Sequence, residues 1–124
     1  MSTLRADTIQ STGGGAATLT NQSAAKSWVN FNGNGTIAAR NSLNLSSLTD
    51  NATGKYTVSF TSSMTGDNYS VSGHSASDGS TWDFWMGSSN GYPTSSNVGV
   101  ESGYGASTYN DATYVFCTIN GDLA

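Results

Sequence analysis

Few residues of this 124-residue chain carry side chains that could do acid, base or nucleophilic chemistry. It contains one histidine, one cysteine, one glutamate and seven aspartates. Ser72, His74 and Asp78 could in principle supply a nucleophile, a base and an orienting acid, but serine is the commonest residue here and no Gly-x-Ser-x-Gly motif surrounds Ser72. We therefore interpret His74 as a surface or loop residue.

Glycoside hydrolysis requires two carboxylates on either side of a sugar-binding cleft. Asp83 lies between Trp82 and Phe84, which could form a sugar platform, and Glu101 is a distant candidate partner. Nothing in the sequence brings the two acids together. We therefore expect no enzymatic activity and keep a polysaccharide depolymerase as a third, less favoured hypothesis.

Metal-ligand patterns are weak throughout the chain. Asp50-Asn51 and Asp67-Asn68 offer oxygen ligands without the dense spacing of a calcium loop, and turn formation explains both pairs. Cys117 is interpreted as a small buried apolar residue. We expect no metal site within the chain and no cofactor, and leave open a cation held between subunits.

Recognition through aromatic and uncharged hydrogen-bonding groups is the chemistry that remains. Aromatic faces pack against the C–H faces of sugar rings, while amide, carboxylate and hydroxyl groups bond the sugar hydroxyls. Trp82, Phe84 and Trp85 are equally suited to a core. The candidate ligand-binding residues are Trp82, Asp83, Trp85, Tyr92, Tyr104 and Tyr109.

The composition indicates a β-rich protein with a thin core. Ser, Thr, Asn and Gly make up just over half of the residues, only 10% are charged, and Trp, Tyr and Phe supply the large rings. A short chain with a thin core needs a disulfide, a metal or subunit association. One cysteine excludes an internal disulfide and no Cys/His cluster could hold zinc. We therefore expect a homo-oligomer.

The distribution of charge and hydropathy argues against two classes of partner. The four basic residues, Arg5, Lys26, Arg40 and Lys55, are scattered and form no stripe that could neutralise a nucleic-acid backbone. No apolar run is long enough to span a membrane, and residues 1–10 lack the apolar core of a secretory signal. We expect synthesis in the cytoplasm, no nucleic-acid binding and no membrane insertion.

Two-residue alternation predicts strands. Residues 56–61 place apolar and polar side chains on opposite sides, and residues 113–119 are apolar on both sides, which predicts a central strand or a strand at a subunit contact. Further strands are expected over 36–39, 43–48 and 69–72, with loops at 49–54 and 64–68, as an antiparallel meander. We expect an all-β, antiparallel, jelly-roll-like β-sandwich over residues 25–124.

Residues 1–24 are expected to form an extended arm for attachment or subunit exchange. Leu4 and Ile9 are its large apolar residues, and Gly13-Gly14-Gly15 interrupts any regular element. Trp28 and Phe31 could share one face of a short helical turn or belong to an extended segment. Together with Leu4 and Ile9 they are the candidates for core or inter-subunit packing.

Residues 25–60 carry a more specific pattern. It comprises Ala-Lys-x-Trp-Val-Asn-Phe-Asn-Gly from Ala25, Gly-Thr-Ile-Ala-x-Arg ending at Arg40, residues 43–47, a turn at residues 49–51 and Gly-x-Tyr-Thr-Val-x-Phe from Gly54. This block, about a third of the chain, resembles the tail-fibre and related receptor-recognition proteins of tailed phages, especially phages of aquatic bacteria.

The resemblance implies a virion structural protein, and proteins of this kind are typically trimers. It would be a tail-fibre, tail-tip or knob component that contacts other virion proteins through its N-terminal arm and presents its loop-rich second half to a host cell-surface glycan. A capsid decoration, or cement, protein that stabilises the particle is the alternative.

Overall fold

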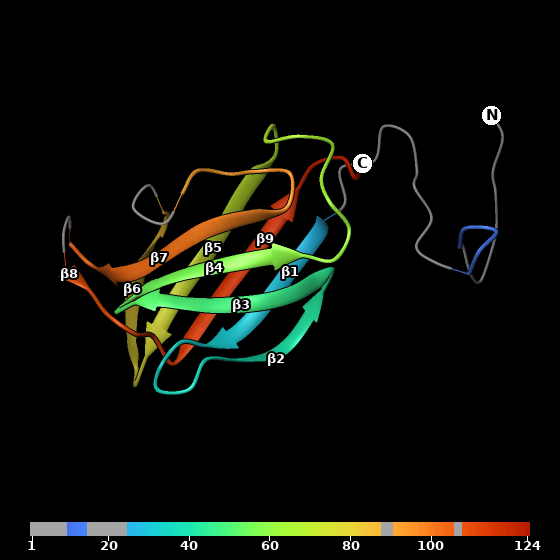
Figure 1. Cartoon of the computed structure of the whole chain (residues 1–124). Coiled ribbons are helices and arrows are strands. Elements are labelled where there is room, and N and C mark those ends of the chain that lie inside the picture. Colours follow the sequence, from blue (N-terminus) through green and yellow to red (C-terminus); the bar gives the residue numbers. More distant parts are fainter. Residues whose placement is uncertain (1–9, 15–24, 88–90, 106–107) are drawn as a thin grey trace, which may run out of the picture.

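A computed structural model describes residues 10–14, 25–87, 91–105 and 108–124. Leu4 and Ile9, with most of the expected arm, lie outside these residues. In the described part the regular structure is entirely β, and every strand pair is antiparallel (Figure 1). The strands are β1 (Ala25–Asn32), β2 (Ala38–Leu43), β3 (Leu45–Ala52), β4 (Lys55–Phe60), β5 (Ser70–Ser77), β6 (Ser80–Met86), β7 (Asn97–Tyr104), β8 (Thr108–Tyr109) and β9 (Tyr114–Asn120).

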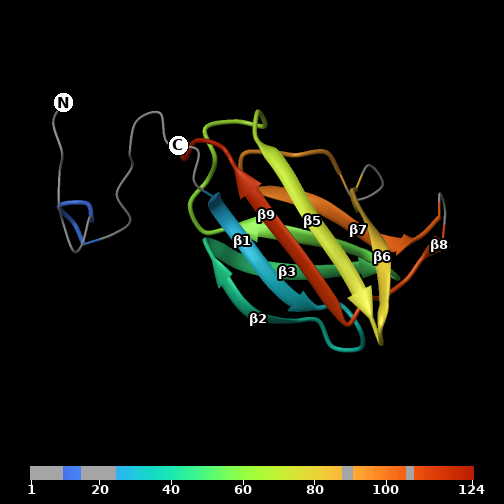
Figure 2. The same ribbon diagram turned by 180° about the vertical axis from the view of Figure 1, so that it is seen from behind.

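The strands form two facing layers that share strand β6. One layer has the order β2-β1-β9-β5 and the other β6-β7-β4-β3, with β8 on β7. The first half of β6, through Trp82, pairs with β5, and the second half, from Asp83, pairs with β7. Figures 1 and 2 show the two layers from opposite sides. The all-β, sandwich-like architecture expected from the sequence is thus confirmed as a nearly closed antiparallel sheet.

At the two edges that lie away from β6, the chain passes from one layer to the other at Asn44, which directly joins β2 to β3. Asn44 has a φ of 56°, a left-handed conformation that asparagine tolerates better than most residues. Its side-chain Oδ1 accepts a hydrogen bond from the Ser62 amide at 2.7 Å, and its Nδ2 donates one to the Ser62 carbonyl at 3.0 Å. The chain therefore changes layers at a corner that is tied to the segment following β4.

The core lies between the layers and is built by alternation along the central strands. On β9, Val115, Cys117 and Ile119 are buried, so the interpretation of Cys117 as a buried apolar residue is confirmed. Phe31 from β1 and Tyr56 from β4 meet edge to face, with ring centroids 5.1 Å apart. The other fully or nearly fully buried apolar residues are Val29, Val58, Phe60, Met64, Val98, Val100 and Ala112.

Gly73 allows a large ring to enter the core beside β5. A Cβ at this position would meet the Phe84 ring at 2.5 Å and would also meet the Phe116 carbonyl oxygen. Only a residue without a side chain fits, because real Cβ atoms essentially never approach other heavy atoms so closely. Phe84 therefore packs against the core, one of the two alternatives for it.

Several expected elements are confirmed, and others are wrong. The strand expected over 56–61 is β4, and the one over 113–119 is β9, which lies centrally between β1 and β5. The loop expected over 49–54 is wrong, because β3 continues to Ala52 by pairing with β4, and only a tight turn remains. The meander is also wrong, because β2 and β3 lie at opposite ends of the strand order, and β4 pairs with β7 rather than with β5.

The helical alternative for the segment around Trp28 is wrong. The segment is strand β1, and successive side chains of a strand point to opposite faces. Phe31 is fully buried within the core, whereas Trp28 is half-buried on the outer side of its sheet. These two rings therefore lie on opposite sides of the same sheet, Phe31 in the core and Trp28 on the outside.

Candidate functional site

The sandwich has two distinct ends. At one end, which we call the entry end, β1 begins opposite the last residue of β9, since Ala25 pairs with Asn120. At the other, the distal end, β8 pairs with the last residues of β7, far from the start of β1 in both views (Figures 1 and 2).

Five of the six candidate ligand-binding residues gather on β6, β7 and β8 toward the distal end. We call Trp82, Trp85, Tyr104 and Tyr109, together with Asp83, the distal cluster. Trp82 packs against the core, whereas Asp83 and Trp85 lie on the opposite, outer side of β6, so the cluster occupies both sides of this strand. Trp82 meets Tyr104 edge to face with centroids 5.9 Å apart, and Trp85 meets Tyr109 in the same way at 6.2 Å. The sequence predicted these residues but not their pairing, which depends on the β6–β7 register.

The ammonium group of Lys55 packs against the second ring pair, Trp85 and Tyr109. The Lys55 Nζ atom lies 4.1 Å from the centroid of the Tyr109 ring, a distance at which the ring face attracts a positive charge. Trp85, Glu101 and Lys55 lie side by side on three neighbouring strands. Tyr109 is thereby held between a tryptophan and a lysine.

Asp83 and Glu101 come to adjacent strands, although the sequence alone did not join them. Asp83 pairs with Gly103 and Trp85 pairs with Glu101, so the two acids are diagonal neighbours on one face. The Asp83 carboxylate accepts a hydrogen bond from the Gly105 amide at 3.0 Å. Glu101 is only 4% exposed, so its carboxylate is poorly placed to reach a saccharide from solvent.

The remaining candidate, Tyr92, lies apart from these ring pairs in the connection between β6 and β7. Its side chain is 73% exposed, the most open of the large apolar and aromatic residues that the structure describes. Exposure of this degree leaves most of the side chain accessible to a ligand.

The three residues considered as a triad share no hydrogen bond in the described part of the chain. Ser72 and His74 are exposed neighbours on the outer side of β5, and Asp78 is exposed in the turn that follows it. Their cross-strand partners on β9 are Thr118 for Ser72 and Phe116 for His74.

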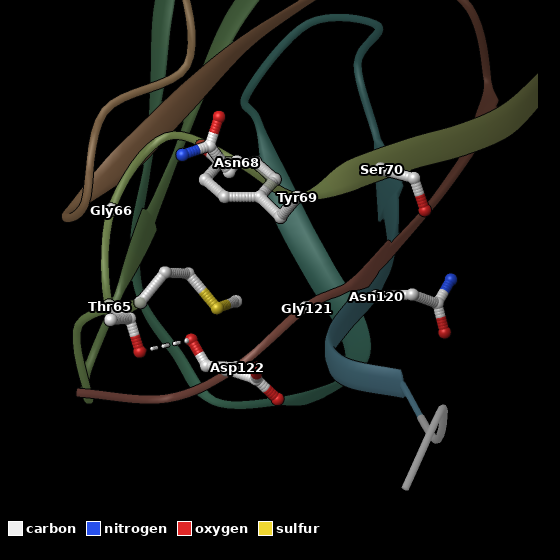
Figure 3. Close-up of a pocket in the computed structure, with 9 residues that line it drawn as sticks. Thr65, Gly66, Asn68, Tyr69, Ser70, Asn120, Gly121 and Asp122 are labelled. Atoms are coloured by element: carbon white, nitrogen blue, oxygen red, sulfur yellow. Dashed lines mark hydrogen bonds between the residues drawn. The ribbon is translucent and has the colours of Figure 1, made fainter. Parts of the chain in front are cut away.

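A hollow of about 500 Å³ opens at the entry end (Figure 3). The Tyr69 hydroxyl is bonded to the carbonyl oxygens of Thr94 and Asn97, both at 3.0 Å, and burial raises the pKa of Tyr69 to about 12. The ring is therefore a fixed, neutral wall. The other lining residues are Met64, Thr65, Gly66, Asn68, Ser70, Asn120, Gly121 and Asp122.

The polar groups of this hollow could bond a small polar ligand. The Asp122 carbonyl accepts from the Thr65 hydroxyl at 3.2 Å, the bond drawn in Figure 3. Its carboxylate and the Asn68 and Asn120 amides make no hydrogen bond to other described residues. From the sequence, Asn68 was expected as a turn residue and Tyr69 as the start of a strand, and neither was a candidate for this hollow. No local pattern predicts that residues 64–70 and 120–122 come together.

Asp111 was not singled out from the sequence. Its carboxylate bonds the β3–β4 turn near the distal end. Its Oδ1 atom accepts a hydrogen bond from the Gly54 amide at 2.6 Å and lies 3.2 Å from the Tyr56 hydroxyl. Burial is the main cause that raises the pKa of Tyr56 well above its usual range. Asp111 thus links the β3–β4 turn to the core.

Comparisons with protein-family models, curated proteins and solved structures found no match to this chain. Among the residues described, no three His, Cys, Asp or Glu side chains gather as a metal site would require. The described part also contains no helix long and apolar enough to cross a membrane.

Proposed function

We propose that this chain is a virion structural protein of a tailed phage, a trimeric tail-fibre, tail-tip or knob component that attaches the particle to the host surface. The observation that carries the proposal is the position of the distal cluster. Its ring pairs lie toward the end of the sandwich opposite the start of β1. A chain held through the residues that precede β1 would present this end of the sandwich outward, with Tyr104 as the most exposed ring of the cluster.

The chemistry of the distal cluster favours a glycan as the ligand. Tyr104 is 52% exposed and is supported by Trp82 from the side, so it can offer a ring without collapsing onto its neighbours. Rigid aromatic anchors surrounded by hydroxyl, amide and backbone groups suit a polar ligand with apolar C–H faces. Tyr92, which lies apart from the ring pairs on the β6–β7 connection, would be a separate point of contact.

The remaining parts of the proposal rest on the sequence. The resemblance of residues 25–60 to phage receptor-recognition proteins supports a place in the virion. Residues 1–24 would serve as the arm that contacts other virion proteins, and the sandwich would follow a jelly-roll-like plan. The thin core and the lack of a disulfide support a homo-oligomer, and the resemblance to fibre-like phage proteins supports a trimer.

A capsid decoration protein is the second candidate, and one observation favours it. The outer side of the β2-β1-β9-β5 sheet exposes Leu43, Tyr114 and Phe116, and a surface of this kind could clamp a capsid subunit. Fluorescently labelled protein separates the two functions. Adsorption to host cells supports attachment, whereas binding to capsids alone supports decoration.

The distal cluster itself can be tested in the same assay. Labelled full-length chain is mixed with a panel of aquatic bacterial isolates, and a strain that adsorbs the protein is chosen. The Trp85→Ala/Tyr109→Ala and Tyr104→Ala variants should lose at least about tenfold in adsorption, the equivalent of about 1.4 kcal/mol. Asn68→Ala, in the entry-end hollow, is the matched control and should adsorb normally.

Two results would count against the proposal. Equal adsorption by the cluster variants and the parent would show that the rings do not contact the receptor. Adsorption to no isolate, combined with firm binding to isolated capsids, would favour the decoration function.

A further inference from the structure

The outer side of the β2-β1-β9-β5 sheet carries an apolar patch that no part of the described chain covers. Leu43 is 46% exposed, Tyr114 44% and Phe116 40%, and Trp28 is half-buried beside them. We call these four residues, together with Arg40, the outer aromatic face. Large apolar groups that gather on one surface usually mark a site of interaction.

Strand register makes this patch continuous. Side chains of directly paired residues in an antiparallel sheet lie on the same face. Leu43 pairs with Trp28, and Trp28 in turn pairs with Thr118. In the next row Phe116 lies between Asn30 and His74. The patch therefore extends over β2, β1 and β9, and the polar Ser72 and His74 of β5 continue the same face.

The ring geometry favours a protein over a sugar as the occupant. The Tyr114 and Phe116 rings are stacked, 6.4 Å apart and inclined by only 8°. The Arg40 guanidinium lies 4.4 Å from the Tyr114 centroid and donates a hydrogen bond to the Thr113 carbonyl at 2.7 Å. Tyr114 thus already packs against a ring and a cation. This leaves less of its ring face for a stacked sugar and suits interdigitating side chains better.

The distribution of charge favours a second copy of this chain. Strands β1, β2, β5 and β9 contain no Asp or Glu, although the whole chain has a net charge of −4. Copies that meet through this face keep their carboxylates away from the interface. These strands carry two basic residues. The Arg40 guanidinium is already engaged by Tyr114 and Thr113. Lys26 lies near the start of β1, away from the stacked rings, so the rings themselves offer an acidic partner no free cation.

The polar groups of the face are also self-complementary. Asn30, Asn41, Ser72 and Thr118 carry amides and hydroxyls, each of which can both donate and accept hydrogen bonds. Around a threefold axis, one part of this face meets another part of the same face on the next copy. The amides and hydroxyls can then satisfy one another without any opposite charge. We infer that copies of this chain associate through the outer aromatic face, with Phe116 near the centre of the interface.

This inference rests on the homo-oligomer of the proposed function and names its interface. The test uses the full-length chain and measures its mass in solution by light scattering. The parent should have the mass of a trimer at micromolar concentration, and Tyr114→Ser/Phe116→Ser should fall to about one third of that mass. Tyr92→Ser, an exposed ring in the β6–β7 connection, should keep the parent mass.

Leu43→Glu is a second variant in case the double change prevents folding. It adds one carboxylate to an exposed position of the same face and should also reduce the mass. If folded variants of both kinds keep the trimer mass, the interface lies elsewhere, while adsorption to cells still tests the proposed function separately.

A monomeric parent would overturn the inference directly. If the outer-face variants of such a monomer also lost binding to isolated tails or capsids, the face would belong to a contact with a different virion protein. If the monomer still adsorbed to cells through the distal cluster, the attachment function would survive without the trimer.

Discussion

Asp111 shows how much one carboxylate can organise in a chain with few charges. It accepts a hydrogen bond from the amide of Gly54, whose φ of 66° lies in the left-handed region. It also lies within hydrogen-bonding distance of the buried Tyr56 hydroxyl. A single side chain thus fixes the turn that precedes β4 and the ring that closes the core below it.

Removing this carboxylate should destabilise the fold. Asp111→Ala would leave the Gly54 amide without this acceptor, at a cost of about 1–3 kcal/mol. The Tyr56 hydroxyl would keep its second acceptor, the Gly33 carbonyl at 3.3 Å. Urea unfolding followed by tryptophan fluorescence measures the change. Asp122→Ala, which removes an exposed carboxylate with no hydrogen bond to other described residues, is the control and should change stability little. An equal loss in both variants would contradict the role given to Asp111.

Because the Cys117 thiol is buried, we expect the protein to become less stable at alkaline pH. Burial raises the pKa of its thiol from about 9 to about 12. Below pH 9 the thiol is neutral in both the folded and the unfolded chain, so it does not change the free energy of unfolding there. Above pH 9 the unfolded chain ionises first, and the free energy of unfolding should fall by up to roughly 1.4 kcal/mol per pH unit until about pH 12.

The measurement is the free energy of unfolding against pH for the parent and for Cys117→Ala. Tyr69, with its pKa also raised to about 12 by burial, adds a decline of the same sign in both proteins. The variant should therefore decline less steeply between pH 9 and 12. Identical slopes in the two proteins would show that the Cys117 thiol is not protected from ionisation by the fold.

Among the elements, the corner between β2 and β3 depends on the side chain of Asn44. Asn44→Gly keeps the left-handed backbone but loses both hydrogen bonds to Ser62, and should cost about 1 kcal/mol. Asn44→Ala also places a Cβ in an unfavourable conformation and should cost about 1 kcal/mol more. Thermal unfolding ranks the three proteins. Alanine as stable as glycine here would show that the corner relaxes without strain.

Strand β5 approaches its neighbours closely only because Gly73 has no side chain. Gly73→Ala would push a methyl group into the Phe84 ring and the Phe116 carbonyl, and overpacking of this kind typically costs about 1–3 kcal/mol. Gly66→Ala, where a Cβ would meet no atom within 4 Å, is the matched control. Chemical denaturation of both variants tests the difference, and equal stability would mean that Phe84 has another position available.

Strands with simple alternation could be predicted from the sequence, and the others could not. Tyr56, Val58 and Phe60 alternate with polar residues, so β4 was visible. On β7, however, all residues from Val98 to Gly103 are buried, although this segment includes Gly99, Glu101 and Ser102. The side chains of Trp85 and Tyr109, which come from β6 and β8, cover the outer side of β7. No pattern within β7 itself predicts this burial.

The candidate site was predictable in its residue types but not in its arrangement. Trp82 and Trp85 stand out by composition alone, yet their ring partners Tyr104 and Tyr109 depend on the pairing of β6, β7 and β8. The outer aromatic face was anticipated only in part. Residues 113–119 were expected to be apolar on both sides, and the structure shows that the second side, Tyr114 and Phe116, is open.

For the whole molecule, association through an acid-free face predicts little dependence on salt. Salt screens interactions between exposed charges and weakens interfaces that depend on them. The oligomer proposed here gathers apolar rings, amides and hydroxyls instead, so its mass should stay constant when ionic strength is raised from low to high. Dissociation in high salt would show that charge pairs, absent from this face, hold the copies together.

The division of β6 between the two layers has a consequence for how the molecule opens. A sandwich of two separate sheets can lose one sheet by sliding or splaying while the other persists. Here β5 and β7 hold opposite halves of the same strand, so neither layer can detach without breaking the backbone hydrogen bonds of the other. The amides of β9 and β4, in different layers, should therefore exchange with solvent through one shared opening event rather than two.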